Sequence, residues 1–219
     1  MYIDIHVHNQ YEQENSRLVL NIFPNSIDKL ECNGLYSVGL HPWYINEKTY
    51  PSEINSVKTA SENHNVIAIG EIGLDKNIDV SYLTQVKVFE QQLEIAENSK
   101  KPVIIHCVKA YDDIISIRKK SNRSIPWIIH WFNASEQIAG ELLKYNCYLS
   151  FGIMLFKENS KAFKVFQNMP LNKAFFETDD TGISISEVYE KAVIARNIKL
   201  TELNKQIKSN FKSCFGHLI

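Results

Sequence analysis

The feature that most constrains the fold is a series of eight short, β-rich runs spaced along a chain of 219 residues. Three of them, residues 66–69, 103–105 and 127–129, are continuous apolar stretches without the alternation of a half-exposed sheet. Such runs are typical of parallel strands covered on both faces. The predicted strands are Tyr2–His8, Arg17–Phe23, Leu35–His41, Val66–Ile72, Pro102–Cys107, Pro126–Trp131, Cys147–Gly152 and Ala174–Asp179.

Segments with helical periodicity separate the later strands. Residues 81–99, 135–145 and 186–196 each combine apolar and polar positions at the spacing of one helix face. In the first of these helices the predicted apolar positions are Leu83, Val86, Phe89, Leu93 and Ala96. The predicted N-cap residues are Ser135, as half of a capping box, and Ser186 and Thr201 as better candidates.

Strands that alternate with helices in this order predict a parallel sheet, and eight of them predict closure into a TIM-like (β/α)8 barrel of the α/β class. The first two βα units must be shortened, because residues 9–16 are too few for a crossover helix and residues 26–33 allow barely two turns. A barrel of this class usually needs roughly 250 residues. Because no linker or low-complexity segment divides the sequence, we expect a single domain over residues 1–219.

Composition restricts the partners and the compartment. A net charge of −1 argues against coating duplex nucleic acid, which needs a clustered positive surface. The four cysteines lack metal-type spacing, residues 1–4 do not resemble a signal peptide, and the apolar runs are shorter than a membrane helix. We therefore expect a cytoplasmic enzyme with reduced thiols, no membrane contact and no obligate protein partner.

Residues that can bind metals occur at the ends of five predicted strands. In the first strand, alternation places Asp4, His6 and His8 on one face. Four further apolar runs end in the ligand-type residues Glu71, His106, His130 and Asp179. Any one of them alone is more simply a hydrogen-bonded core histidine, a helix-start carboxylate or a turn residue. Barrels keep their active sites at the C-terminal ends of strands. Because ligand-type residues occur at five such ends, the sequence predicts a metal centre.

Six protein ligands exceed what one catalytic ion accepts if it is to keep a water. They fit two divalent ions ~3.5–4 Å apart, bridged by a carboxylate and a hydroxide. We expect the ions to come from Zn, Mn, Mg, Fe and Ni, and the imidazole-rich set favours Zn, Mn, Fe or Ni over Mg or Ca. The predicted ligands are His6, His8, Glu71, His106, His130 and Asp179.

Several motifs give the chain a resemblance to the TatD family of metal-dependent deoxyribonucleases, within the amidohydrolase superfamily. They are Asp4-Ile-His6-Val-His8, Gly39-Leu-His41-Pro-Trp43, Gly70-Glu71-Ile-Gly-Leu-Asp75, Ile105-His106-Cys107, His130-Trp-Phe132 and Glu177-Thr-Asp179. The resemblance implies that His6, His8, Glu71 and Asp179 hold one ion. It also implies that Glu71, His106 and His130 hold the other ion, with Glu71 as the bridge.

The sequence departs from the family where arginines are expected. Val108 follows the His-Cys pair in place of the family's Arg, and residues 180–184 replace a longer loop that ends in an Arg-Asn-Glu-Pro motif. Both changes remove groups that could grip a phosphate. Lys109, Lys157 or Arg196 could substitute, although a lysine lacks the bidentate fork of arginine.

Aromatic and basic residues near the strand ends are candidates for substrate binding. We predict this role for His41, Trp43 and Lys109, with His41 on a phosphate oxygen and Trp43 near the substrate entrance. Trp131 and Phe132 are equally compatible with stacking on bases and with packing between barrel and helices.

The expected activity is metal-dependent hydrolysis of a phosphodiester through a metal-bridging hydroxide. The catalytic residues would be Glu71 and Asp179, and the substrate single-stranded or end-exposed DNA cleaved as by an exonuclease. The missing arginines keep two alternatives open. One is a hydrolase of a small phosphoester, lactone or amide, and the other is a metal-binding scaffold with little catalysis.

Overall fold

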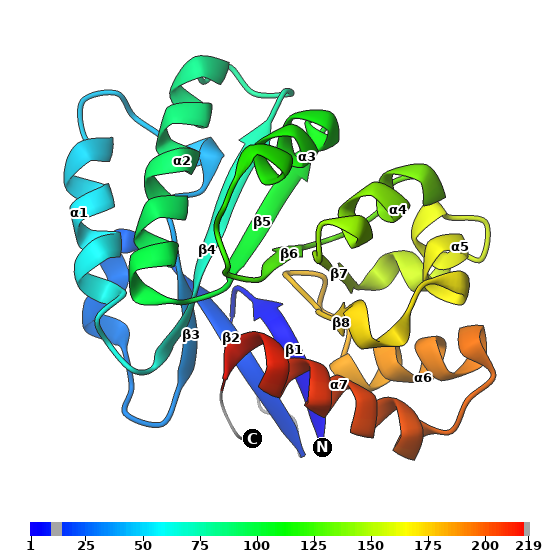
Figure 1. Cartoon of the computed structure of the whole chain (residues 1–219). Helices are drawn as coiled ribbons and strands as arrows, with labels where there is room; N and C mark the ends of the chain where they lie inside the picture. Colours follow the sequence, from blue (N-terminus) through cyan, green and yellow to red (C-terminus); the bar gives the residue numbers. More distant parts are fainter. Residues whose placement is uncertain (10–14, 217–219) are drawn as a thin grey trace. The chain divides into compact units, whose positions relative to one another are not determined.

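The computed structural model describes residues 1–9 and 15–216 (Figure 1). Its eight strands follow one another in the sheet in the order of the sequence. All eight predicted strands are confirmed, and the fourth extends three residues beyond its predicted end, to Asp75. The strands are β1 (Tyr2–Val7), β2 (Ser16–Ile22), β3 (Leu35–Val38), β4 (Val66–Asp75), β5 (Val103–Val108), β6 (Trp127–Ile129), β7 (Tyr148–Phe151) and β8 (Ala174–Phe176).

Helices connect most of the strands. The α-helices are α1 (Tyr50–Ala60), α2 (Tyr82–Ser99), α3 (Tyr111–Lys120), α4 (Glu136–Lys144), α5 (Lys161–Asn168), α6 (Ile185–Arg196) and α7 (Leu200–Phe215). The 3-10 helices are η1 (Pro24–Lys29), η2 (Pro42–Tyr44), η3 (Ile153–Phe156) and η4 (Leu171–Lys173). None of the helices in the described ranges is both long and apolar enough to cross a membrane.

The strand order and the alternation with helices confirm the (β/α)8 class. At the other end of the strand order, β8 lies beside β1, because Val7 pairs with Asp179 in parallel. The second βα unit is short as predicted, since η1 replaces an α-helix there. The predicted shortening of the first unit falls partly on residues 10–14, which lie outside the described residues.

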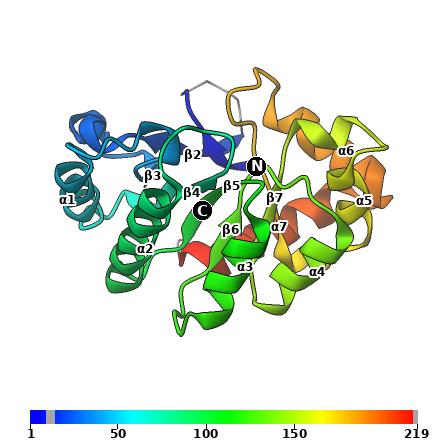
Figure 2. The ribbon, with the colours of Figure 1, turned by 90° about the horizontal axis from the view of Figure 1, so that it is seen from above.

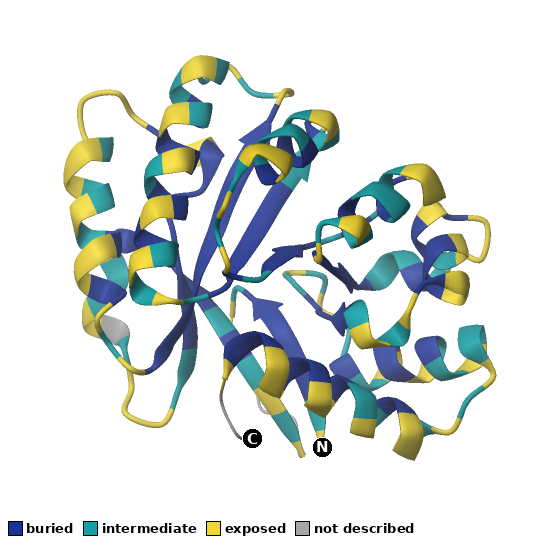
Figure 3. Cartoon of the chain, viewed as in Figure 1, coloured by how far each residue is buried: buried dark blue, intermediate teal, exposed yellow. Residues whose placement is uncertain are grey.

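By its internal packing the chain divides into two compact units. The terminal unit consists of Met1–Leu20 and Ile129–Ile219, and the central unit is Asn21–Ile128. The expectation of a single domain over residues 1–219 stays a prediction. In each unit most strand residues are buried, β2 being half-exposed at its start, and the outward helix faces are exposed (Figure 3).

In the central unit, α2 packs against β4, and Figures 1 and 2 show α1 beside α2. The predicted apolar face of α2 is partly wrong: Leu83 is exposed and Val86 is only half-buried. The buried face carries Gln85 and Gln92 instead. The Gln92 amide bonds both the N–H and the C=O of Leu40, so these polar side chains act as connectors to strand ends and loops.

In the terminal unit, one aromatic side chain joins α6 to two of the strands. The Tyr189 hydroxyl on α6 binds the backbone N–H and C=O of Ile3 in β1, each at 3.1 Å. Its ring lies 4.7 Å from that of Phe176 in β8. Buried hydroxyls need such partners, so Tyr189 fixes α6 to the first and last strands.

Two predicted N-caps are wrong. α6 begins after Ser184, which forms a capping box with Glu187, because Ser184 rather than Ser186 has the extended backbone that a cap needs. α7 begins after Lys199, so Thr201 lies within its first turn. Ser135 is confirmed as a cap for α4, where its hydroxyl accepts the N–H of Ile138.

Candidate metal centre

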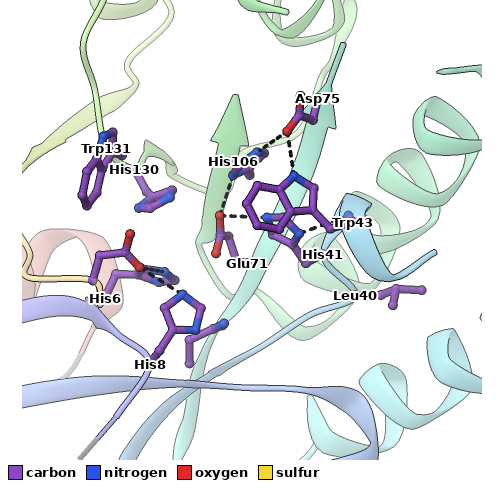
Figure 4. Close-up of polar contacts among 12 residues, drawn as sticks. His6, His8, Leu40, His41, Trp43, Glu71, Asp75, His106, His130 and Trp131 are labelled. Atoms are coloured by element: carbon purple, nitrogen blue, oxygen red, sulfur yellow. Dashed lines mark hydrogen bonds and ion pairs between the residues drawn. The ribbon is translucent and has the colours of Figure 1, made fainter. Parts of the chain in front are cut away.

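In the central unit, two predicted site residues converge on the carboxylate of a third, Glu71 (Figure 4). Glu71 in β4 is 3% exposed. Its Oε1 lies 2.8 Å from His106 Nδ1 in β5 and 3.3 Å from His41 Nε2, after β3. The ligand atoms of these three residues all lie within 4.8 Å of one another. The central unit therefore contains a compact set of nitrogen and oxygen donors that lie within β4 and β5 and just after β3.

The orientation of His41 follows from its place at the start of η2. Its Nδ1 accepts a hydrogen bond from the Trp43 backbone N–H at 3.1 Å. In the neutral ring the proton then sits on Nε2, which faces Glu71. His41 thus directs an N–H donor toward Glu71. A group that binds a phosphate oxygen must also offer such a donor.

A second carboxylate, Asp75, completes the surroundings of His106. Its Oδ2 lies 3.2 Å from His106 Nε2 and accepts the indole N–H of Trp43 at 2.7 Å. Burial raises the pKa of Asp75, but hydrogen bonds from Trp43, the Asn77 backbone N–H and His106 outweigh it, so the pKa lies below its usual value. The sequence pattern assigns Asp75 no role, yet alternation along β4 places it on the same face as Glu71.

In the terminal unit, His6 and His8 converge on Asp179. Asp179 Oδ1 lies 3.0 Å from His8 Nε2 and 3.6 Å from His6 Nε2. Burial raises the pKa of Asp179, but the hydrogen bond to His8 and the neighbouring His130 and His6 rings outweigh it, so the pKa is lowered overall. The carboxylate is therefore ionised at neutral pH, as a metal ligand or proton acceptor has to be.

His130 lies in the same unit, with its ring centroid 4.5 Å from that of His6. Its Nδ1 lies 3.3 Å from Oε1 of Glu177, a fully buried carboxylate that also accepts the Trp131 backbone N–H at 2.5 Å. The sequence gives Glu177 no role beyond its place in the Glu177-Thr-Asp179 motif. Its burial next to His130 suggests that it orients this ring.

Asp4 fixes the end of β8 rather than joining the donor set. Its carboxylate accepts the Thr178 hydroxyl at 2.6 Å and the Thr178 backbone N–H at 3.2 Å. Because Thr178 directly precedes Asp179, Asp4 holds the last predicted ligand beside β1. This contact gives Asp4 a structural role within the first-strand motif.

The donors of each unit fit a divalent metal ion. In the central unit, His106 Nδ1 and Glu71 Oε1 are 2.8 Å apart, a separation that suits two ligand atoms sharing one ion. In the terminal unit, two imidazole nitrogens approach one carboxylate oxygen. Imidazole and carboxylate together are typical ligands of Zn, Mn, Fe and Ni.

Comparison with known proteins agrees with this chemistry. The sequence model of a family described as TatD related DNase matches residues 20–216, most of the chain. The chain belongs to the TatD family. Among solved structures, the TatD homologue YjjV of Escherichia coli K12 has a TM-score of 0.85 at 20% identity, covering 99% of this chain and 98% of that one. A TatD family hydrolase of Entamoeba histolytica has a TM-score of 0.79 at 16% identity, covering 98% and 97%.

Sequence relatives of this TatD protein are named as hydrolases. An uncharacterised metal-dependent hydrolase of Buchnera aphidicola is 35% identical over 69% of this chain and 58% of its own length. YabD of Bacillus subtilis, with the same description, is 34% identical over 65% of this chain and 57% of its own length. The human 3'-5' RNA nuclease TATDN2 is 32% identical over 64% of this chain and 19% of its own length. The chain thus spans less than two thirds of the length of the first two relatives.

The remaining candidate substrate residues of the TatD protein differ in exposure. Trp43 is 56% exposed, and Lys109 and Lys157 are also exposed. Phe132 is buried against Phe151, which favours the packing alternative for this residue. Trp131 is half-buried, so both alternatives for it stay open.

Arg196 has a structural role that the sequence does not reveal. Its Nη1 donates to the carbonyls of Phe166, Gln167 and Met169 at 2.9, 2.6 and 3.0 Å. These groups belong to the C-terminal end of α5 and the residue that follows it. Arg196 therefore ties α6 to α5 and is not available as a substitute for the missing family arginines.

We expect Arg196→Met to lower the free energy of unfolding by about 1–3 kcal/mol, because it removes charge-assisted hydrogen bonds and leaves carbonyls short of a donor. Thermal denaturation should show a fall of a few degrees, whereas the specific activity of the folded variant should not change. Arg17→Met, at an exposed position in the same unit, is the matched control. If Arg196→Met lost activity without losing stability, Arg196 would instead be a substrate-binding residue.

Proposed function

We propose that this TatD protein is a metal-dependent phosphodiesterase that shortens nucleic acid from exposed ends. The observation that carries the proposal is the convergence of histidines and a carboxylate in each unit, at strand ends. The family description and the nuclease name of the human relative support the substrate class. The proposed ligands of two divalent ions are His6, His8, Glu71, His106, His130 and Asp179.

When bound, the ions would supply a water of lowered pKa and neutralise negative charge on the phosphoryl oxygens. The protein's own groups would position the substrate and move the protons. Asp179 is ionised at neutral pH because of its histidine neighbours. Its carboxylate would orient the attacking water, take its proton and pass that proton to the leaving oxygen.

Substrate binding would involve the central unit. The His41 Nε2–H would donate to a phosphate oxygen, with Lys109 adding a positive charge beyond β5. The exposed ring of Trp43 would stack on an unpaired base, an interaction of about 1–3 kcal/mol per base. An unpaired strand offers such bases, which is why we favour single-stranded or end-exposed substrates. The four free cysteines support a reducing, cytoplasmic setting.

The test is to incubate the chelator-treated protein with end-labelled single-stranded DNA, single-stranded RNA and a small chromogenic phosphodiester, each with Mn, Mg or Zn. We expect metal-dependent shortening of an oligonucleotide. Turnover of the small ester alone would favour the second candidate, a small-ester hydrolase, which the missing arginines support. Metal-dependent thermal stabilisation without hydrolysis of any substrate would identify a scaffold and overturn the proposal.

A further inference from the structure

A buried carboxylate outside the proposed ligand set joins the metal centre to an exposed aromatic ring. Asp75 is 2% exposed and lies at the end of β4. Its Oδ2 faces two nitrogen atoms, Nε2 of His106 at 3.2 Å and Nε1 of Trp43 at 2.7 Å (Figure 4). One oxygen atom therefore serves a proposed ligand and a proposed substrate-binding residue together.

The two nitrogens of His106 face different carboxylates. Nδ1 lies 2.8 Å from Glu71 Oε1, and Nε2 faces Asp75. A proton on Nε2 leaves the lone pair of Nδ1 directed at Glu71, where an ion shared by both atoms would satisfy it. Histidine ligands of metals typically donate their second ring N–H to a carboxylate in this way, which fixes the tautomer and raises the basicity of the ligand.

Asp75 is itself held firmly. Its Oδ1 accepts the Asn77 backbone N–H at 2.8 Å. The buried amide of Gln85 bonds the Asp75 backbone on both sides, at 2.8 Å to the N–H and 3.0 Å to the C=O. Gln85 belongs to α2, which packs along β4. These hydrogen bonds fix the position of Asp75, because neither its side chain nor its backbone can rotate without breaking them.

The other partner of Asp75 is the most exposed of the nearby aromatic residues. Trp43 is 56% exposed, but its indole N–H is tied to Asp75. Its ring meets the His41 and His106 rings edge-on, with centroids 5.0 and 5.8 Å away. A tryptophan held at one edge and open to solvent elsewhere can receive a flat ligand without reorganising.

We propose that Asp75 is a positioning residue that fixes His106 for metal binding and holds the Trp43 ring as a stacking platform for a nucleobase. This inference rests on the proposed nuclease function. It predicts that metal binding changes the surroundings of the Trp43 indole, since both depend on Asp75 Oδ2. It also predicts that the two partners of Asp75 affect different steps, His106 the metal and Trp43 the base.

The first measurement is metal affinity in the chelator-treated full chain, by competition with a chromophoric chelator. Asp75→Asn removes the charge. It also replaces one carboxylate oxygen with an NH2 group, so the side chain can no longer accept all three hydrogen bonds. We expect its affinity for Mn or Zn to fall by about 10–100-fold, while Asp113→Asn, an aspartate bonded to Lys76 and Tyr82 instead, binds as the parent does. The melting temperature of each metal-free variant reports whether it is folded. Parent-like affinity in folded Asp75→Asn would overturn the proposal.

The second measurement uses Trp43 as its own probe and does not depend on a fully folded Asp75 variant. Titrating metal should shift the tryptophan emission of the parent and of Trp131→Phe, and the shift should be clearly smaller in Trp43→Phe. Trp43→Phe should raise KM for an oligonucleotide several-fold, and by a larger factor than it raises KM for a small phosphodiester. An unchanged oligonucleotide KM would overturn the platform role. Weakened metal binding in Asp75→Asn, in a protein that hydrolyses nothing, would support the positioning role while refuting the proposed nuclease.

Discussion

Glu71→Gln is expected to reduce metal-dependent turnover by at least on the order of 10²–10³-fold, the loss that follows removal of one strong electrostatic group from an active site. The substitution preserves size, so packing around this buried side chain in β4 should survive. What changes is the donor set, because an amide replaces one carboxylate oxygen with an NH2 group that cannot bind a cation. Glu71 Oε1 faces both His106 Nδ1 and His41 Nε2, so the variant disturbs the whole set in the central unit.

Three measurements separate a chemical effect from a structural one. The variant should keep the melting temperature of the metal-free parent within a few degrees, bind less metal at equilibrium dialysis and lose kcat. Glu90→Gln, at an exposed position of α2, is the matched control and should behave as the parent. If folded Glu71→Gln retained full activity and metal content, Glu71 would not be a ligand and the proposed mechanism would be wrong.

Strand positions could be predicted from the sequence because parallel strands covered on both faces leave apolar runs. The run from Val103 to Ile105 and the alternation around His6 and His8 are direct consequences of burial. Helix faces were harder to predict where polar residues are buried. Gln85 and Gln92 interrupt the apolar pattern of α2, yet they are buried because their amides satisfy backbone groups at strand ends and loops. Hydropathy cannot anticipate a polar side chain whose partner is distant in sequence.

In the candidate site, too, some residues could be predicted from the sequence and others could not. Ligand-type residues at strand ends were predictable, since the barrel class fixes where active sites lie. Asp75 and Glu177, which contact His106 and His130, occur in the family-like motifs, but the motifs assign them no role. Their role depends on which imidazole nitrogen they face, and only three-dimensional contacts supply this. A carboxylate at an even spacing from a ligand on the same strand, as Asp75 is from Glu71, is nevertheless a usable hint.

Gly73→Ala is expected to destabilise the fold by about 4 kcal/mol or more, which places it among exceptional single substitutions. Gly73 has a φ of +151°, a conformation that side chains with a Cβ rarely adopt. A Cβ there would also lie 2.0 Å from the backbone oxygen of His106, its partner in the β4–β5 pair. Because the obstacle is backbone, no side-chain rotation relieves it. β4 and β5 would have to separate between Glu71 and Asp75, so thermal denaturation should show a fall of at least ~10 °C, or no soluble protein.

Gly140→Ala provides the contrast within the same chain. Gly140 lies inside α4, and nothing stands within 4 Å of the position that its Cβ would occupy. Alanine should therefore stabilise the protein by about 0.5–1 kcal/mol, through lower chain entropy in the unfolded state and better helix propensity. Opposite signs for one chemical change would show that the cost at Gly73 comes from the close approach of β4 to β5. Equal effects at both positions would mean that the two strands can adjust, and that Glu71 and His106 are held less rigidly than their geometry indicates.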